Sequence, residues 1–169
     1  MSSTIQIRQA TTDDFNAIVA LNESEVMHTS PMTIARLGEL DALANYHRVV
    51  LINDQVAGFL LAMKNDSAYI NDNFEWFASR YHSFLYVDRI VIGKAFHGLK
   101  LGSLLYQDIF QYAKTHGITA ITCEYNIVPA NEPSRIFHDK FSFQEVGSQW
   151  LNNHSKLVSL QMATVETPK

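Results

Sequence analysis

The spacing of apolar residues predicts both strands and helices in the first half of the chain. Residues 4–8 alternate between apolar and polar positions, as in a strand with one buried face, and residues 11–14 supply capping side chains before Phe15. A short β-branched run at 47–52 and an apolar run at 56–63 flank a turn at residues 53–55. The expected elements are a strand at 4–8, a helix at 15–21, a loop at 22–33, a helix at 34–45, and antiparallel strands at 47–52 and 56–63.

The longest continuous pattern runs over residues 84–116 and predicts a strand, a short turn and an amphipathic helix. The turn carries Gly98 and Gly102, and Gly117 is typical of the residue that follows a helix. A strand that leads through a tight turn into a helix presents several unpaired backbone N–H groups at one point. Together with the positive end of the helix dipole, these groups form a site for a phosphate or pyrophosphate.

Shorter elements are predicted around this central stretch. The aromatic residues between 64 and 83 indicate either a short helix at 73–79 or the lining of a pocket. The other expected elements are a strand at 118–125, a turn at 126–133, a helix at 133–141, and a closing hairpin with strands at 143–150 and 156–163. Because the chain contains no repeat, linker or low-complexity segment, we expect residues 1–169 to form one domain with helices over a mixed sheet.

Composition and charge narrow the class of protein. Hydrophobic residues make up 47% of the chain and charged residues 18%, as in an ordinary globular protein. A net charge of −4 argues against nucleic-acid binding. Cys123 is the only cysteine, which excludes an internal disulfide and fits a reducing compartment. The sequence shows neither a signal-peptide pattern nor an apolar run that could cross a bilayer, so we expect a cytoplasmic protein without membrane contact.

Two motifs carry a family resemblance. The first covers residues 87–102, VDRIVIGKAFHGLKLG, in which His97 stands where Arg or Gln is usual and Lys100 replaces the first glycine. The second covers residues 131–143, NEPSRIFHDKFSF, in which His138 replaces a tyrosine. In their order and spacing, these motifs resemble those of the GNAT superfamily of acetyl-CoA-dependent N-acetyltransferases. The aromatic segment at 76–81 that leads into residues 86–89 also looks like a bacterial branch of uncharacterised members.

The resemblance implies an α/β (α+β) fold. Its mixed, mostly antiparallel sheet has six to seven strands and about four flanking helices, and the fourth and fifth strands splay apart. The pantetheine arm of acetyl-CoA is expected in that gap, where a main-chain N–H near Val91 or Ile92 polarises the thioester carbonyl. The residues that the resemblance assigns to acetyl-CoA are Val91, Ile92, His97, Gly98, Leu99, Lys100, Leu101, Gly102, Ser103, Asn131, Ser134 and Phe137.

Three side chains are candidates for proton transfer. Asp88 is either the base that takes a proton from the acceptor ammonium or the partner of a neighbouring Lys or Arg. Glu124 is the rival base, with a hydrogen-bonding role as its alternative. His138 occupies the position of the tyrosine that protonates the thiolate in the family; an imidazole could do this work, order a water that does it, or simply be a half-buried histidine.

The acceptor pocket is predicted from the aromatic run and the first interhelix loop. The residues expected there are Glu25, His28, Trp76, Tyr81 and Tyr86, although aromatic residues in such a run more often form a core. Asn131 is expected to contact the CoA arm or to cap its own helix. Cys123 is expected to be a small buried hydrophobe. The spacing of the seven histidines does not suggest a metal site.

The expected function is direct transfer of an acetyl group from acetyl-CoA to a primary amine of a small molecule or peptide. A homodimer through the last strands is common in the resembling family. The alternative is a non-catalytic acyl-CoA-binding sensor or interaction module on the same fold. A nucleotide-binding domain is a third candidate, but the glycines lack the spacing of a P-loop or a dinucleotide-binding motif.

Overall fold

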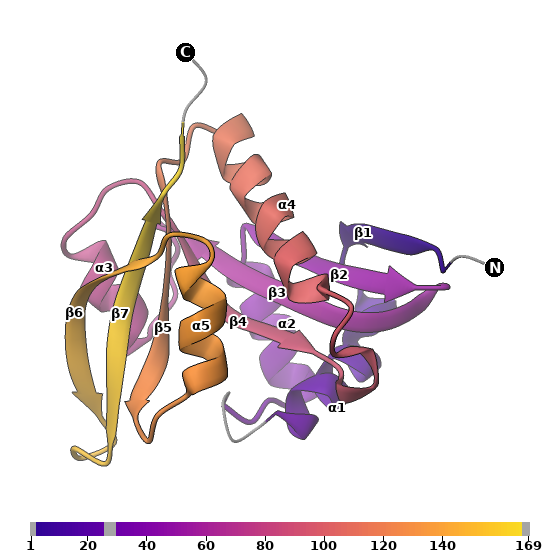
Figure 1. The fold of residues 1–169 in the computed structure, drawn as a ribbon, viewed down its shortest axis with the longest axis horizontal. Helices are drawn as coiled ribbons and strands as arrows, with labels where there is room; N and C mark the ends of the chain where they lie inside the picture. The colour runs from indigo at the N-terminus through magenta and orange to yellow at the C-terminus, as the bar shows by residue number, and fades with distance from the viewer. Residues whose placement is uncertain (1–2, 26–29, 167–169) are drawn as a thin grey trace. The chain divides into compact units, whose positions relative to one another are not determined.

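The computed structural model describes residues 3–25 and 30–166, and Figure 1 shows the path of the chain. The strands in these ranges are β1 (Ile5–Gln9), β2 (Tyr46–Ile52), β3 (Gln55–Lys64), β4 (Leu85–Ile92), β5 (Ala120–Val128), β6 (Gln144–Leu151) and β7 (Lys156–Thr164). The α-helices there are α1 (Phe15–Ser24), α2 (Ile34–Leu43), α3 (Asp72–Ala78), α4 (Leu101–Thr115) and α5 (Glu132–Asp139). Two short 3₁₀ turns, η1 (Thr12–Asp14) and η2 (Lys94–Phe96), complete them.

The strand order is β1-β2-β3-β4-β5-β7-β6. The β1–β2, β2–β3, β5–β7 and β6–β7 pairs are antiparallel, whereas β4 and β5 are parallel. The structure therefore confirms the mixed, mostly antiparallel sheet. In the described ranges there are five α-helices, one more than expected, because residues 72–78 form a helix. The side chain of Asn71 caps that helix by accepting hydrogen bonds from the N–H groups of Asn73 and Phe74.

The pairing of β4 with β5 is short. In the described part of the chain, Leu85 lies opposite Ile121 and Tyr86 opposite Thr122, and the ladder between these strands ends there. This limited pairing confirms the predicted splay of the fourth and fifth strands. By their internal contacts the residues form two compact units, which share β4: its first two residues belong to the second unit and its remainder to the first.

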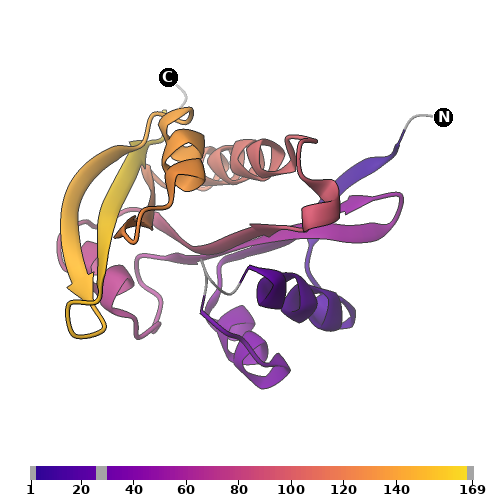
Figure 2. The same ribbon diagram turned by 60° about the horizontal axis from the view of Figure 1, so that its bottom comes forward.

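The first unit contains residues 1–63, 67–69 and 87–111. In Figure 2, α1 and α2 lie on one face of β2 and β3, and α4 lies on the other. Both faces of these strands are covered, which explains why β2 and β3 are almost entirely apolar and buried. A polar link also ties β2 to α4, because Tyr46 and Arg48 both donate hydrogen bonds to Asp108, at 2.6 and 2.8 Å.

Helix α1 is longer than predicted, and the reason is a buried polar residue. We expected a helix at 15–21 followed by a loop, but α1 continues to Ser24. Asn22 in its last turn is completely buried, and its side chain donates to the backbone oxygen of Ser30 and accepts from Arg89. An inward-facing asparagine breaks the apolar periodicity on which the prediction depended.

The second unit contains residues 64–66, 70–86 and 112–169. In Figure 2, α3 and α5 lie on opposite faces of the strands β5, β7 and β6. Packed rings form the core next to α3, where Phe74 and Phe77 contact both Phe84 and Tyr86, with ring centroids 5.8–6.1 Å apart. The aromatic run is therefore mainly core, the alternative that the sequence left open.

A close backbone approach between β3 and β4 predicts that Gly58→Ala is destabilising. A Cβ atom at Gly58 would lie 2.7 Å from the carbonyl oxygen of Val91 and 2.6 Å from Cδ1 of Ile92. Since the carbonyl belongs to the backbone, the strands must shift, and we expect a loss of about 1–3 kcal/mol in the free energy of unfolding. Denaturant titration measures this loss. As a control, Gly38→Ala in α2 meets no atom within 4 Å and should gain up to about 1 kcal/mol; equal stability of the two variants would contradict the close approach.

Candidate functional site

The turn between β4 and α4 has a defined backbone conformation. The N–H of Gly93 donates to the carbonyl oxygen of Ala57 on β3 at 2.8 Å, which holds the end of β4. The imidazole Nε2 of His97 lies 2.9 Å from the backbone oxygen of Ile92 and must be its donor, because a carbonyl only accepts. Gly98 then adopts a φ of 85°, in the left-handed region that glycine enters without strain. These contacts turn the chain sharply from β4 into α4.

The backbone amides at the start of α4 point to an anion site. Within the described residues, the first intrahelical bond in this region runs from the N–H of Leu104 to the oxygen of Lys100, and the N–H groups of residues 98–103 have no backbone acceptor. The first amides of a helix have no partner inside the helix, and its dipole favours negative charge there. The predicted phosphate site therefore has the donors that it needs.

Lys100 takes the place of a glycine and adopts a glycine-like conformation, with a φ of 62°. Its side chain is exposed and is not crowded by neighbouring atoms. The cost of a lysine at this position is therefore its left-handed backbone conformation. Lys94, in η2 of the same turn, is also exposed. Two lysines beside unsatisfied amides add positive charge, which favours a phosphate group further.

Asp88 lies in a buried network of the first unit. Its side chain is 5% exposed; one carboxylate oxygen accepts from the hydroxyl of Tyr69, and the other accepts from Nε of Arg89 at 2.7 Å. Arg89 is 7% exposed and also donates to Asn22 and to the backbone oxygen of Ser30. Burial raises the pKa of Tyr69 beyond its usual range, and the nearby Asp88 raises it further, so the phenol stays protonated and donates. Both oxygens of Asp88 are thus engaged in the ion-pair arrangement that was one of its two predicted roles.

Glu124 has different surroundings, in the second unit. It lies on β5 and is half-buried, and its Oε2 accepts a hydrogen bond of 2.7 Å from the hydroxyl of Tyr86. Tyr86 is completely buried, whereas Glu124 retains solvent contact. A partly exposed carboxylate can be reached by a ligand, and the hydrogen bond from Tyr86 fixes its orientation. Both properties suit a general base.

His138 is held in one tautomer by its own helix. It is 4% exposed, and its Nδ1 lies 2.7 Å from the backbone oxygen of Ser134. Since this carbonyl can only accept, Nδ1 carries the hydrogen, and Nε2 of the neutral ring is a proton acceptor. Burial also lowers the pKa of His138, so the ring is neutral near pH 7. To act as the acid predicted from the tyrosine position, His138 would first have to gain a proton.

The other predicted residues of this region form the beginning of α5. The side chain of Asn131 accepts from the N–H of Ser134 at 3.3 Å and so caps the helix, one of its two expected roles. The hydroxyl of Ser134 lies 3.2 Å from Nδ1 of His138. Phe137 is half-buried and contacts the rings of His138 and Phe141.

The residues predicted for an acceptor pocket lie in different surroundings. Glu25 ends α1 in the first unit, and His28 lies outside the described residues. In the second unit, Trp76 stacks under the guanidinium of Arg80 at 3.9 Å, and Tyr81 contacts Phe77. Tyr86 is part of the core. The role of the described members of this group in acceptor binding remains a prediction.

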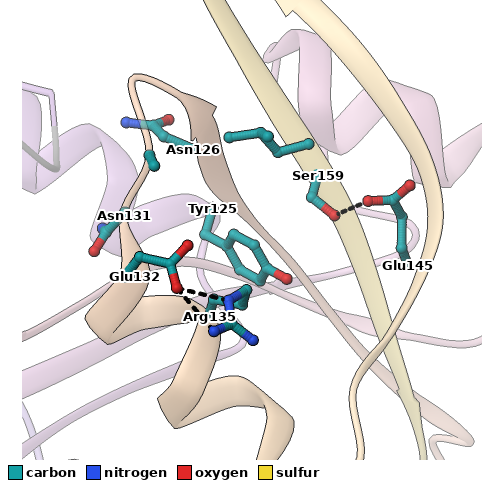
Figure 3. A pocket seen from close by; sticks show the side chains of 9 residues that line it. Tyr125, Asn126, Asn131, Glu132, Arg135, Glu145 and Ser159 are labelled. Carbon is teal, nitrogen blue, oxygen red and sulfur yellow. Dashed lines mark hydrogen bonds and ion pairs between the residues drawn. The ribbon is translucent and has the colours of Figure 1, made fainter.

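A pocket of about 180 Å³ lies in the second unit, and the sequence did not predict it. In Figure 3, Ser159 of β7 and Glu145 of β6 lie on one side, and Glu132 and Arg135 of α5 lie on the other beside the ring of Tyr125 of β5. Ser159 donates to Glu145 at 2.6 Å, and Arg135 pairs with Glu132 at 2.8 Å. The lining residues are Tyr125, Asn126, Ile127, Ala130, Asn131, Glu132, Arg135, Glu145 and Ser159.

This pocket depends on strand register. Tyr125 lies opposite Ser159, which in turn lies opposite Ser148 of β6. A bulge between Glu145 and Gly147 brings the carboxylate of Glu145 to Ser159. The glycine inside the predicted strand is the sequence signal that could have indicated this bulge.

Three other observations bear on the predicted class of protein. Within residues 3–25 and 30–166, no group of His, Cys, Asp and Glu side chains could hold a metal ion. None of the described helices has both the length and the apolar character needed to cross a membrane. Cys123 is buried and reduced, as expected for a small core residue.

The family follows from a comparison with known protein families. Residues 7–143 match the model of the acetyltransferase (GNAT) family. The chain belongs to this family. It is therefore an acyltransferase, and acetyl-CoA is its acyl donor. No match was found among the curated protein sequences.

Solved structures share the fold at low sequence identity. Ard1 from Thermoplasma volcanium has a TM-score of 0.79 and 14% identity, with 96% of this chain and 98% of that chain covered. The ribosomal-protein-S18-alanine N-acetyltransferase from Escherichia coli has a TM-score of 0.75 and 10% identity, with 98% and 97% covered. The acetyltransferase yncA of Salmonella typhimurium, solved with acetyl-CoA, has a TM-score of 0.71 and 18% identity, with 96% and 94% covered.

Proposed function

We infer that this GNAT-family member is an N-acetyltransferase that moves an acetyl group directly from acetyl-CoA to a primary amine of a small molecule or peptide. The observation that carries this proposal is the set of backbone amides at residues 98–103, which have no backbone acceptor among the described residues, beside Lys94 and Lys100. Such donors suit the pyrophosphate of CoA. The family match spans residues of both compact units, which supports treating residues 1–169 as one acetyltransferase domain.

The proposed reaction needs one base and one proton for the leaving group. The base takes a proton from the acceptor ammonium, and the neutral amine then attacks the thioester carbonyl carbon. A C–N bond forms, the C–S bond breaks, and the thiolate leaves with a proton that the acylated nitrogen loses. A main-chain N–H near Val91 or Ile92 would stabilise the negative charge on the carbonyl oxygen. Positioning of the two reactants supplies much of the remaining rate.

We assign the base to Glu124 rather than Asp88. Asp88 is 5% exposed and accepts from both Tyr69 and Arg89, so protonating it would leave a buried guanidinium without its counter-charge. Glu124 is half-buried and bound by a neutral phenol, so it can gain and lose a proton at lower cost.

The proton for the thiolate need not come from an imidazolium. His138 is neutral near pH 7 and carries its hydrogen on Nδ1, which is bonded to Ser134. We propose that His138 accepts, through a water, the proton lost by the nitrogen and passes it to the thiolate, rather than acting as an acid that is protonated beforehand.

The cytoplasmic location and the homodimer through the last strands also remain predictions.

Binding of the donor is tested by thermal unfolding. Acetyl-CoA at 100 times its Kd should stabilise the folded state by about 2.7 kcal/mol and raise Tm by roughly 5–10 °C. Ser103→Asp places a carboxylate in the first turn of α4, which favours the helix but repels the pyrophosphate, so it should keep Tm and lose the shift. Ser103→Ala keeps every backbone amide and should retain the shift. Equal shifts in both variants would contradict the proposed anion site.

Catalysis is tested separately from binding. Release of CoA thiol is measured with acetyl-CoA and a panel of primary amines, and mass spectrometry identifies the product by its added acetyl group. His138 is neutral and its tautomer is fixed, so it does not carry the proton that the thiolate needs. For this reason a non-catalytic acyl-CoA-binding sensor is the second candidate function. Acetyl-CoA binding without turnover on any amine would favour that sensor.

A further inference from the structure

The buried phenol of Tyr86 in the second unit combines packing contacts of its ring with a hydrogen bond from its hydroxyl to Glu124. Tyr86 is the second residue of β4 and lies opposite Thr122 in the parallel ladder. Glu124 is two residues further along β5, so its side chain leaves the same face as that of Thr122. The hydroxyl of Tyr86 reaches Oε2 of Glu124 at 2.7 Å. The phenol thus spans two strands at the place where their pairing ends.

The ring of Tyr86 has little freedom to move. It is 0% exposed, and the rings of Phe74 and Phe77 contact it with centroids 5.8 and 6.1 Å away. Helix α3 carries both phenylalanines, and Asn71 caps this helix. The position of the hydroxyl is therefore fixed, and its hydrogen bond orients the carboxylate of Glu124. A functional group held by a rigid neighbour loses less entropy when it reacts.

We propose that Tyr86 is a positioning residue for the acyl-transfer reaction, which orients the Glu124 carboxylate for proton removal from the acceptor amine. This role rests on the proposed function of Glu124 as the base. Tyr86 is completely buried, so its effect on the acceptor is exerted through Glu124. From the sequence, Tyr86 was expected to line the acceptor pocket. Its complete burial and its hydrogen bond to Glu124 instead indicate that it supports the proposed base.

A double-variant cycle on kcat tests this role. Tyr86→Phe removes only the hydroxyl and should lower kcat about tenfold to 100-fold, the effect of losing one hydrogen bond to a charged group, while KM for acetyl-CoA stays within about twofold. In the Glu124→Gln background the same change should leave kcat unaltered, because the group on which the phenol acts is already gone. A purely structural tyrosine would lower kcat in both backgrounds.

Two further variants keep the test decisive. Glu124→Asp retains a carboxylate but withdraws it from the phenol, so it should resemble Tyr86→Phe, and it provides the result if Tyr86→Phe does not fold. Tyr46→Phe is the matched control: it removes another buried phenol that donates to a carboxylate, Asp108, in the first unit, and it should leave kcat unchanged.

The outcomes separate the two hypotheses. If Glu124→Gln retains the wild-type kcat, the proposed base is wrong and the role of Tyr86 fails with it. If Glu124→Gln is slow but Tyr86→Phe and Glu124→Asp retain at least half of the wild-type kcat, only the positioning role is overturned. A further tenfold loss on adding Tyr86→Phe to Glu124→Gln overturns it as well.

Discussion

Asp88→Asn should lower the free energy of unfolding by about 3–5 kcal/mol, the typical cost of removing one partner from a buried ion pair. Arg89 is 7% exposed and keeps its contacts with Asn22 and Ser30, but these neutral groups cannot balance its charge. For a chain of this size we expect a fall in Tm of roughly 6–20 °C. Denaturant titration and thermal unfolding measure the two quantities.

Two comparisons show whether the loss comes from the ion pair. Asp139→Asn removes a carboxylate of an exposed pair with Arg135, whose side chains are 53% and 46% exposed, and should not change Tm measurably. The double variant Asp88→Asn/Arg89→Gln should lose less stability than the sum of the two single changes, because both charges are absent. Additive losses would mean that the two residues stabilise the fold independently.

Glu124→Gln should lower kcat by about 10²–10⁴-fold, the usual contribution of a general base. Glutamine has nearly the same shape and can still accept from the hydroxyl of Tyr86, so Tm should change little. Without a base, turnover needs acceptor that is already neutral, and an alkylamine with a pKa near 10.4 is almost fully protonated at pH 7. The rate of the variant should therefore rise about tenfold per pH unit up to the pKa of the amine.

The same assay decides between the two carboxylates. When both variants are measured well below the Tm of Asp88→Asn, the Asp88 variant should retain kcat within a few fold. If Asp88→Asn is instead the slow enzyme and Glu124→Gln the normal one, their roles must be exchanged. A rate for Glu124→Gln that does not depend on pH would argue against any proton transfer from the acceptor by this residue.

The turn before α4 was predictable because its signals are local, whereas the splay of β4 and β5 was predicted only through the family resemblance. The apolar run before Gly98 and the amphipathic pattern after Gly102 locate the strand, the turn and the helix by residue spacing alone. The helix N-terminus provides backbone N–H donors whatever side chains are present, so His97 and Lys100 do not remove the donors of the predicted anion site. Capping residues at 11–14 likewise located the start of α1, and Asn131 was a candidate cap for α5.

The roles of the polar side chains were not predictable, because they depend on partners far along the chain. Asp88 and Glu124 both stand in apolar strands. Arg89 directly follows Asp88, so their ion pair could be foreseen as one alternative, but the contacts with Tyr69 and Asn22 that complete the buried network come from distant segments. The partner of Glu124, Tyr86, is likewise on another strand. The pocket beside Ser159 likewise combines residues of β5, α5, β6 and β7, which only the folded chain brings together.

The sequence by itself determined the order of the elements, because periodicity and turn residues act within short segments, and its two motifs indicated the family that the comparison then showed. It also predicts an anion site at the start of α4. Tertiary structure alone decided which carboxylate is tied into a buried ion pair and which stays at the protein–solvent boundary. The physical reason is that the cost of moving a charge depends on its burial and on its partners, and both are set by strands and helices that meet only in the folded chain.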